Sequence, residues 1–160
     1  VKNKIKYIVN LNNDLPKIGA RKTNIMTINK DIQREFLNEY HIQGDGQSSV
    51  AYGAYYGTEL VGVMTFKKLT NNGNDYDLTR FATNYNYTYQ GLASKILSHF
   101  INDFKPNSII SFADKRWTLD KDNNLYTKLG FSFEYQTQPD YKYYNFKVDP
   151  YKRFHKFKLL

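Results

Sequence analysis

The hydrophobic pattern changes period at residue 91, and this change limits most strongly how the chain folds. Residues 75–85 alternate as in a strand, whereas residues 92–104 carry apolar side chains at helical spacing, and Pro106 follows. Residues 108–114 (SIISFAD) then form an apolar run, typical of a strand buried on both sides. The helix between the two strands predicts a crossover that makes them parallel, with residues 108–114 in the centre of the sheet.

The segments before this crossover predict a strand, a helix and three further strands. We expect residues 17–28 to form one strand, and Asn29 to cap a helix whose apolar side chains share one face. Two β-rich runs joined at Gly57 and Thr58 predict a hairpin. In the third strand of this meander, alternation places Asp77 and Thr79 on one face and Leu78, Arg80 and Ala82 on the other.

The segments after the crossover predict a short helix within residues 123–130 and strands at residues 131–137 and 141–148. Together the elements predict an α+β fold whose mixed sheet has about six or seven strands, with about three or four helices. Residues 1–16 are expected to be a linker or an added edge element, residues 17–148 the domain, and residues 149–160 a basic aromatic tail. Because the chain begins with Val, we expect a processed product or part of a longer chain.

The residue composition excludes several kinds of chemistry. The chain has no cysteine, which removes disulfides, thiol nucleophiles and cysteine-based zinc sites, and its three scattered histidines argue against any metal site. No apolar run approaches the roughly 20 residues that a membrane-spanning helix needs. We therefore expect a cytoplasmic protein without a membrane partner.

The net charge of +8 favours an anionic partner. Residues 142–158 hold six basic residues against one aspartate, a net charge of +5, and interleave them with Tyr and Phe. Lys152, Arg153 and Lys156 are expected to bind DNA phosphates while the aromatic rings stack on bases. A tail that only aids solubility, or one that binds an anionic membrane, stays open as an alternative.

The segment YTKLGF at residues 126–131 resembles the GNAT acyltransferases, which implies their three-layer fold. Further segments resemble a narrower group, namely the phage Mom-like DNA-modification proteins and the GNAT-like domains fused to phage homing endonucleases. These segments are FLNEYHIQG (36–44), LTRF (78–81), GLASKIL (91–97), SIISFADKRW (108–117), LYTKLGF (125–131) and PDYKYYNF (139–146). The resemblance covers about residues 17–147.

The resemblance also shows where this chain departs from ordinary acetyl-CoA enzymes. Their pyrophosphate-binding turn begins with Gln or Arg, and here Thr88 stands at that position, although Gly91 and Ala93 match. Leu119 replaces the Asn that usually precedes the family tyrosine by seven residues. The donor is therefore left open, as an acyl-CoA or a related activated compound.

Three residues are candidates for proton transfer. His41 ends a helix at a glycine-containing loop, and Asp114 directly follows the apolar strand, so either side chain could serve as the base. Tyr126 matches the family tyrosine, which the resemblance implies is the acid. The alternatives are a histidine that stabilises a helix terminus, an aspartate that caps a turn or pairs with Arg116, and a tyrosine that packs on the sheet.

Further candidates would bind the donor or the substrate. Arg80 and the start of the second helix, with Gly91, Ala93, Ser94 and Lys95, are expected to hold the donor, because helix N-termini bind anions. Arg116 and Trp117 form a group that can clamp phosphate and stack on a base, and Tyr141 and Tyr143 border the expected cleft. A structural arginine, an exposed first helical turn and a core tryptophan are the alternatives.

Taken together, these features favour a phage-type GNAT-fold transferase acting on DNA. The resemblance implies transfer of an acyl or carbamoylmethyl group to a base amine, adenine N6, after the base is extruded. One alternative is a noncatalytic DNA-binding module of a homing endonuclease, fused to or cut from a nuclease-containing chain. A second alternative is a conventional acetyl-CoA-dependent N-acetyltransferase.

Overall fold

The computed structural model describes residues 15–71, 73–115, 118, 120 and 122–138, and the backbone of residues 142–145 and 149–155. The chain divides into two units, Val1–Leu129 and Gly130–Leu160, and each is described by itself. None of the helices in the described ranges is long and apolar enough to span a bilayer. The boundaries 1–16, 17–148 and 149–160 and a cytoplasmic location stay predictions.

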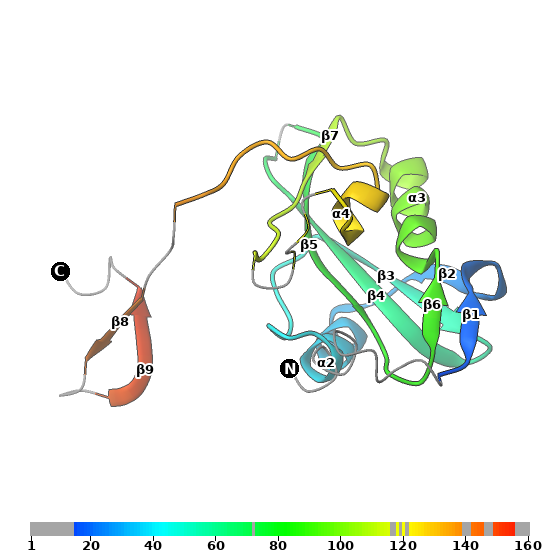
Figure 1. Cartoon of the computed structure of the whole chain (residues 1–160), viewed down its shortest axis with the longest axis horizontal. Coiled ribbons are helices and arrows are strands. Elements are labelled where there is room, and N and C mark those ends of the chain that lie inside the picture. Colours follow the sequence, from blue (N-terminus) through cyan, green and yellow to red (C-terminus); the bar gives the residue numbers. More distant parts are fainter. Residues whose placement is uncertain are drawn as a thin grey trace. The chain divides into compact units, whose positions relative to one another are not determined.

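The first unit is built on a five-stranded mixed sheet in the order β2-β3-β4-β5-β7 (Figure 1). Its strands are β2 (Asn24–Thr27), β3 (Val50–Tyr56), β4 (Glu59–Lys68), β5 (Asp75–Thr83) and β7 (Ser108–Ile110). Neighbouring strands are antiparallel except β5 and β7, which are parallel and joined through helix α3 (Leu92–Phe104). The predicted hairpin, meander and crossover are therefore confirmed, and the fold is α+β.

The predicted central position of residues 108–114 is wrong within the described part of the chain. β7 has three residues and lies at the edge of the five-stranded sheet, beside β5 alone. Ile110 and Phe112 are 37% and 64% exposed. The apolar run indicated burial on two sides, but strand order is set by pairing between distant segments, which a local pattern does not encode.

Helices α2 (Lys30–Tyr40) and α3 cover opposite faces of the sheet (Figure 1). Asn29 caps α2 by accepting a hydrogen bond from the backbone N–H of Ile32 at 2.9 Å, as predicted. Val63 on β4 packs with Phe36 and Leu37 of α2. A Cβ atom on the preceding residue, Gly62, would meet Leu92 of α3, and successive strand residues face opposite sides. We call these the α2 face and the α3 face.

A bulge in the β4–β5 ladder changes which face the second half of β5 presents. Leu78 pairs with Phe66, but the adjacent Thr65 pairs with Arg80, so Thr79 is the extra residue. Directly opposite residues share a face, which puts Arg80 on the α2 face with Thr65. The prediction that Arg80 and Ala82 lie on the face opposite to Asp77 is wrong, because simple alternation does not allow for an inserted residue.

The first segment of the domain is two short strands rather than one. β1 (Lys17–Gly19) pairs in parallel with β6 (Thr88–Gln90), and a 3-10 turn, η1 (Ala20–Lys22), separates β1 from β2. The Thr23 hydroxyl and backbone N–H both donate to the Ala20 carbonyl, at 2.8 and 3.1 Å. The predicted continuous strand at 17–28 is wrong because this local turn satisfies the backbone in place of a ladder.

The short helix α4 (Leu125–Lys128) is confirmed, and it begins with a capping box between Asn124 and Thr127. In the second unit, β8 (Lys142–Asn145) and β9 (Asp149–His155) form an antiparallel pair. Residues 131–138 join no strand ladder in the described part, so the predicted strand at 131–137 is wrong. Phe133 and Tyr135 are 66% and 69% exposed, which shows that alternation alone did not produce a buried face.

Candidate functional site

The loop of residues 41–49 leaves α2 and is held to that helix by the buried side chain of Gln33. Gln33 is 1% exposed. Its Nε2 donates to Asp45 Oδ1 at 2.6 Å and to the Gly46 carbonyl at 3.3 Å, and its Oε1 accepts from Ser48 Oγ at 2.7 Å. Because both ends of the amide are used and shielded from water, they fix the loop relative to α2.

Arg80, which the bulge turns onto the α2 face, contacts the same loop. Its Nε donates to the Gly44 carbonyl at 3.2 Å, and its Nη1 donates to the carbonyl of Thr79 at 2.8 Å. A Cβ atom at Gly46 would lie 3.2 Å from Arg80 Cζ, so this glycine permits the close approach of the loop to the guanidinium. The structure thus brings Arg80 to the loop that begins with His41.

His41 is the C-cap residue of α2, as the sequence predicted, and it interacts electrostatically with the charge of Arg80. Its Nδ1 accepts a hydrogen bond from the Gln43 backbone N–H at 3.1 Å, which places the ring proton on Nε2. Burial, with a smaller contribution from the Arg80 charge, lowers the pKa of His41 to about 4. The imidazole is therefore neutral at pH 7, and its catalytic role stays a prediction.

Asp77, which the sequence analysis did not select, lies on the same face two residues before the bulge. It stands opposite Lys67 on β4. Among the described residues its Oδ1 is buried and has no hydrogen-bond partner. Burial raises the pKa of Asp77, while Lys67 and Arg80 partly oppose this shift. The sequence did contain a signal that could have singled out Asp77, because this acid lies in the middle of the same meander strand as Arg80.

Asp114 lies four residues beyond the end of β7, and Tyr126 lies in α4. The two strands pair through Asp77 and Ile110, and the Ser111 Oγ still donates to the Leu78 carbonyl at 2.9 Å. Asp114 follows, half-buried, and its carbonyl accepts from Thr118 N and Oγ1 at 3.1 and 2.5 Å. Tyr126 lies in α4 and is half-buried. Their proton-transfer roles stay predictions.

The start of α3, where a donor site was predicted, begins at Gly91 in a left-handed conformation, and anion binding there stays a prediction. Gly91 is the N-cap residue with φ of 73°, and no side chain caps the helix. Ser94 is exposed, whereas Ala93 is buried. Lys95 Nζ donates to the carbonyls of Ala20 and Thr23, which ties α3 to the 3-10 turn. Lys95 thus has a structural contact, and its predicted contact with a donor is untested.

All seven predicted DNA-binding residues lie in the second unit or outside the described residues. Arg116, Trp117, Tyr141 and Lys156 are outside the described residues. Tyr143 lies in β8, and Lys152 and Arg153 lie in β9, where the backbone alone is described. Their contact with DNA stays a prediction.

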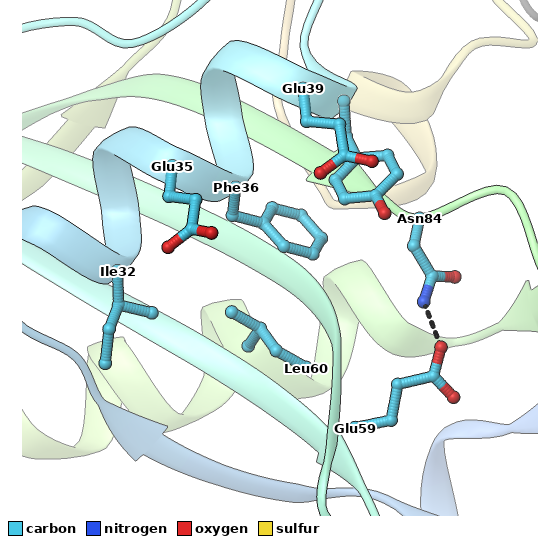
Figure 2. Close-up of a pocket in the computed structure, with 8 residues that line it drawn as sticks. Ile32, Glu35, Phe36, Glu39, Glu59, Leu60 and Asn84 are labelled. Atoms are coloured by element: carbon cyan, nitrogen blue, oxygen red, sulfur yellow. Dashed lines mark hydrogen bonds between the residues drawn. The ribbon is translucent and has the colours of Figure 1, made fainter.

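A groove between α2 and the end of the β4–β5 pair has a volume of about 300 Å³ (Figure 2). Three carboxylates line it, from Glu35 and Glu39 on α2 and Glu59 on β4, together with the apolar side chains of Phe36 and Leu60. Asn84 Nδ2 donates to Glu59 Oε1 at 2.8 Å. This groove was not predictable from the sequence, because its two walls are separated along the chain and meet only in the folded structure.

Comparisons with known proteins give a family match and a set of similar folds. Residues 21–131 match the model of the Acetyltransferase (GNAT) family. No curated protein matches the chain.

Solved structures of similar fold include acetyltransferases and a protein described as a transcriptional regulator. An aminoglycoside acetyltransferase from an uncultured soil metagenomic sample has a TM-score of 0.55 at 17% identity, covering 76% of this chain and 95% of its own. Ribosomal-protein-alanine N-acetyltransferase from Brucella melitensis has a TM-score of 0.53 at 13% identity, covering 73% and 96%. A transcriptional regulator from Bacillus halodurans has a TM-score of 0.54 at 16% identity, covering 74% and 99%. At these identities the likeness shows the fold alone.

Proposed function

Because the chain belongs to the acetyltransferase (GNAT) family, we propose that it transfers an acyl group from an acyl-CoA-type donor to an amine. The expected GNAT fold is confirmed, and the family makes the protein a transferase. One observation carries the proposal. Where β5 separates from β7, the bulge at Thr79 turns Arg80 onto the face that carries Asp77, and Arg80 contacts the loop that starts at His41.

The separation of the two parallel strands supports the donor part of this proposal. Past Leu78, β5 has no ladder partner on the β7 side among the described residues. Backbone N–H and C=O groups left unpaired by a neighbouring strand can bind an extended ligand as a strand would. The uncapped first turn of α3, which begins at Gly91, supports binding of the donor phosphates, because helix N-termini favour anions.

As the specific acceptor we propose DNA, with a base amine as the group that is modified. The net charge of +8, and of +5 within residues 142–158, supports this choice. The resemblance to the phage Mom-like group supports adenine N6 as the amine and a carbamoylmethyl group as an alternative to an acyl group. If the protein instead binds DNA without turnover, the homing-endonuclease module is the better description.

A small cationic amine is the second candidate acceptor, and the groove of Glu35, Glu39 and Glu59 favours it. Three carboxylates on a protein whose net charge is +8 concentrate negative potential in one place. This candidate corresponds to a conventional acetyl-CoA-dependent N-acetyltransferase.

The test measures release of the CoA thiol from acetyl-CoA with three acceptors: spermidine, a lysine-containing peptide and an adenine-containing single-stranded oligonucleotide. Wild type should release thiol with at least one of them, and mass spectrometry should find the acylated amine. Arg80→Gln should lower kcat/KM at least about 10-fold, because the guanidinium orders the loop and supplies charge at the site.

Arg34→Gln is the matched control, because Arg34 is exposed on α2 and pairs with Asp31 at 3.4 Å. It should change kcat/KM less than about two-fold, since surface ion pairs contribute little. Absence of thiol release and of any modified acceptor would refute the transferase proposal. Turnover with spermidine or the peptide, but not with the oligonucleotide, would refute DNA as the acceptor.

A further inference from the structure

The groove between α2 and the end of the β4–β5 pair combines an apolar lining with negative charge. Phe36, Tyr40 and Leu60 line it together with the three glutamates (Figure 2). The ring of Tyr40 lies against Phe36, with centroids 4.6 Å apart, and makes an edge contact with Tyr85 at 5.0 Å. The groove volume of about 300 Å³ falls at the lower end of the range for small-molecule sites, roughly 300–1,000 Å³. The groove is therefore large enough for a small ligand with an apolar body.

The chain supplies no counter-charge to these glutamates in the part that the structure describes. Among the described residues, none of the three forms an ion pair within 4.0 Å. Arg34 precedes Glu35 on α2 but pairs with Asp31 at 3.4 Å. The net charge of the chain is +8, so the groove opposes the charge of the chain as a whole. A bound cation would offset the repulsion between the glutamates.

Glu59 is held in a fixed orientation by two asparagines. Its Oε1 accepts hydrogen bonds from Asn84 Nδ2 at 2.8 Å and from Asn86 Nδ2 at 2.7 Å. Asn84 is 4% exposed, and its own Oδ1 accepts from the Tyr89 hydroxyl. Both bonds to Glu59 reach the same oxygen, and among the described residues none reaches Oε2. The carboxylate is thus oriented before a ligand binds, with one oxygen left for it.

Both walls of the groove place negative charge near the Tyr40 ring. Burial raises the pKa of Tyr40, and the Glu39 and Glu59 carboxylates raise it further. Glu39 belongs to α2 and Glu59 to β4, so the negative potential at the ring comes from two elements. The face of an aromatic ring attracts ammonium groups, and carboxylates beside it add charged hydrogen-bond acceptors.

The acidic residues of α2 are spaced for two positive charges. Glu35 and Glu39 are four positions apart, so they share one face of the helix, with Cβ atoms about 5–6 Å apart. The two nitrogens of a short diamine such as putrescine have a similar separation. We infer that the groove binds a linear alkyl diammonium, with its nitrogens at the glutamates and its methylene chain against Phe36 and Leu60.

This inference goes beyond the proposed function, because it concerns equilibrium binding and requires no acyl transfer. A diamine that serves as the acceptor and a diamine that only regulates the enzyme share this chemistry. Binding is therefore measured first, without a donor, and the two sources of the ligand are separated afterwards.

The experiment titrates the full-length chain with putrescine and with n-butylamine, by calorimetry at constant ionic strength. n-Butylamine has the same methylene chain and a single ammonium group. The variants are Glu35→Gln, Glu39→Gln and the two together, and both positions are exposed, so the variants should fold, which circular dichroism checks. Asp31→Asn is the control, since it removes one charge from the same helix at a residue outside the groove lining.

Wild type should bind putrescine at least about 10-fold more tightly than n-butylamine, because two ammonium groups then meet carboxylates. Each single Gln variant should weaken putrescine binding at least about three-fold, and the double variant should remove the preference for the diamine. Asp31→Asn should change either affinity less than about two-fold, since salt screens an exposed charge outside the groove.

Equal affinity of wild type for the two amines, or an unchanged preference in the double variant, would overturn the inference. Displacement of putrescine by magnesium chloride at the same ionic strength would overturn it too, because it would show a surface that attracts any cation.

Addition of acetyl-CoA then separates the two sources of the ligand. N-acetylputrescine in the mass spectrum identifies an acceptor, whereas unmodified putrescine that alters thiol release with the lysine-containing peptide identifies a regulator. Putrescine binding without thiol release from any acceptor would refute the proposed function and leave this inference standing. Thiol release without putrescine binding would overturn this inference alone.

Discussion

The two faces of the β4–β5 pair carry different side chains at the level of the bulge. On the α3 face, Phe66 stacks on Phe100 with ring centroids 3.6 Å apart, and Tyr76 and Phe104 pack around them. On the α2 face at the same level, the ladder carries Asp77 and the bulge exposes Arg80 to a polar loop. At this level the strands carry aromatic rings on one side and charged side chains on the other, whereas further along the α2 face Val63 and Ala82 pack against α2.

At the level of the bulge, aromatic packing and charged side chains are thus divided between the two faces. Aromatic rings in contact gain dispersion energy and lose exposed apolar area, so the α3 face holds the sheet to its helix. The α2 face keeps one buried carboxylate oxygen, Asp77 Oδ1, that has no hydrogen-bond partner among the described residues, which lowers stability. Substitutions on the α3 face should therefore change folding, and those on the α2 face should change the loop or the pH response.

The largest effect is expected at Phe100, which is fully buried on the α3 face. Phe100→Ala should lower the free energy of unfolding by about 3–5 kcal/mol, because it leaves a cavity beside Phe66. Chemical denaturation measures this change. Phe112→Ala is the control, since Phe112 is 64% exposed, and it should change stability by less than about 0.5 kcal/mol. Equal effects at the two positions would contradict the assignment of the core to this face.

A smaller effect is expected at Gln33, under the loop of the α2 face. Gln33→Leu should lower the free energy of unfolding by about 1–3 kcal/mol, because Asp45 and Ser48 lose buried hydrogen bonds. Hydrogen exchange should also quicken in residues 41–49. The control is Gln43→Ala at an exposed position of the same loop. Unchanged exchange in Gln33→Leu would show that the loop is held by other contacts.

Gly91 tests the start of α3 with little interference from packing. Its φ is 73°, and the nearest atom to a new Cβ is Ala20 Cβ at 3.8 Å. Gly91→Ala should therefore cost about 1–2 kcal/mol of stability, entirely from the left-handed backbone conformation. Gly19→Ala should be neutral or slightly stabilising, because Gly19 has φ of −75° and open space around it. Similar losses in the two variants would contradict this account.

The smallest effect concerns His41 and the pH response of the α2 face. Its folded-state pKa of about 4 lies below the ordinary value of 6.5, so the unfolded chain takes up a proton first as the pH falls. The contribution of His41 to stability should be complete above pH 6.5 and decline toward pH 4. NMR titration of the imidazole should give a midpoint near 4 in wild type and a somewhat higher midpoint in Arg80→Gln. A midpoint near 6.5 in wild type would contradict its burial.

The parts of the fold that depend on neighbouring residues were predictable. The cap at Asn29, the hairpin at Gly57 and the helix after Gly91 follow from capping, turn chemistry and helical spacing, which act within a few residues. The edge position of β7 and the missing strand at 131–137 were not predictable in this way, because strand order and ladder partners depend on distant segments.

The site shows the same division. The sequence singled out His41 and Arg80, but simple alternation turned Arg80 to the wrong face and gave no reason to choose Asp77. A single inserted residue, Thr79, reversed the alternation and brought Arg80 to the loop.

By itself, the sequence determined the helices, the crossover, the excess of positive charge and the family resemblance. Each of these follows from the residue types and their spacing along the chain. Only the tertiary structure decided which side chains meet at the bulge and that Asp77 Oδ1 is buried without a hydrogen-bond partner among the described residues. Burial and hydrogen bonding between β4, β5, α2 and the loop fix those relations, and they exist only once segments far apart in the chain have packed together.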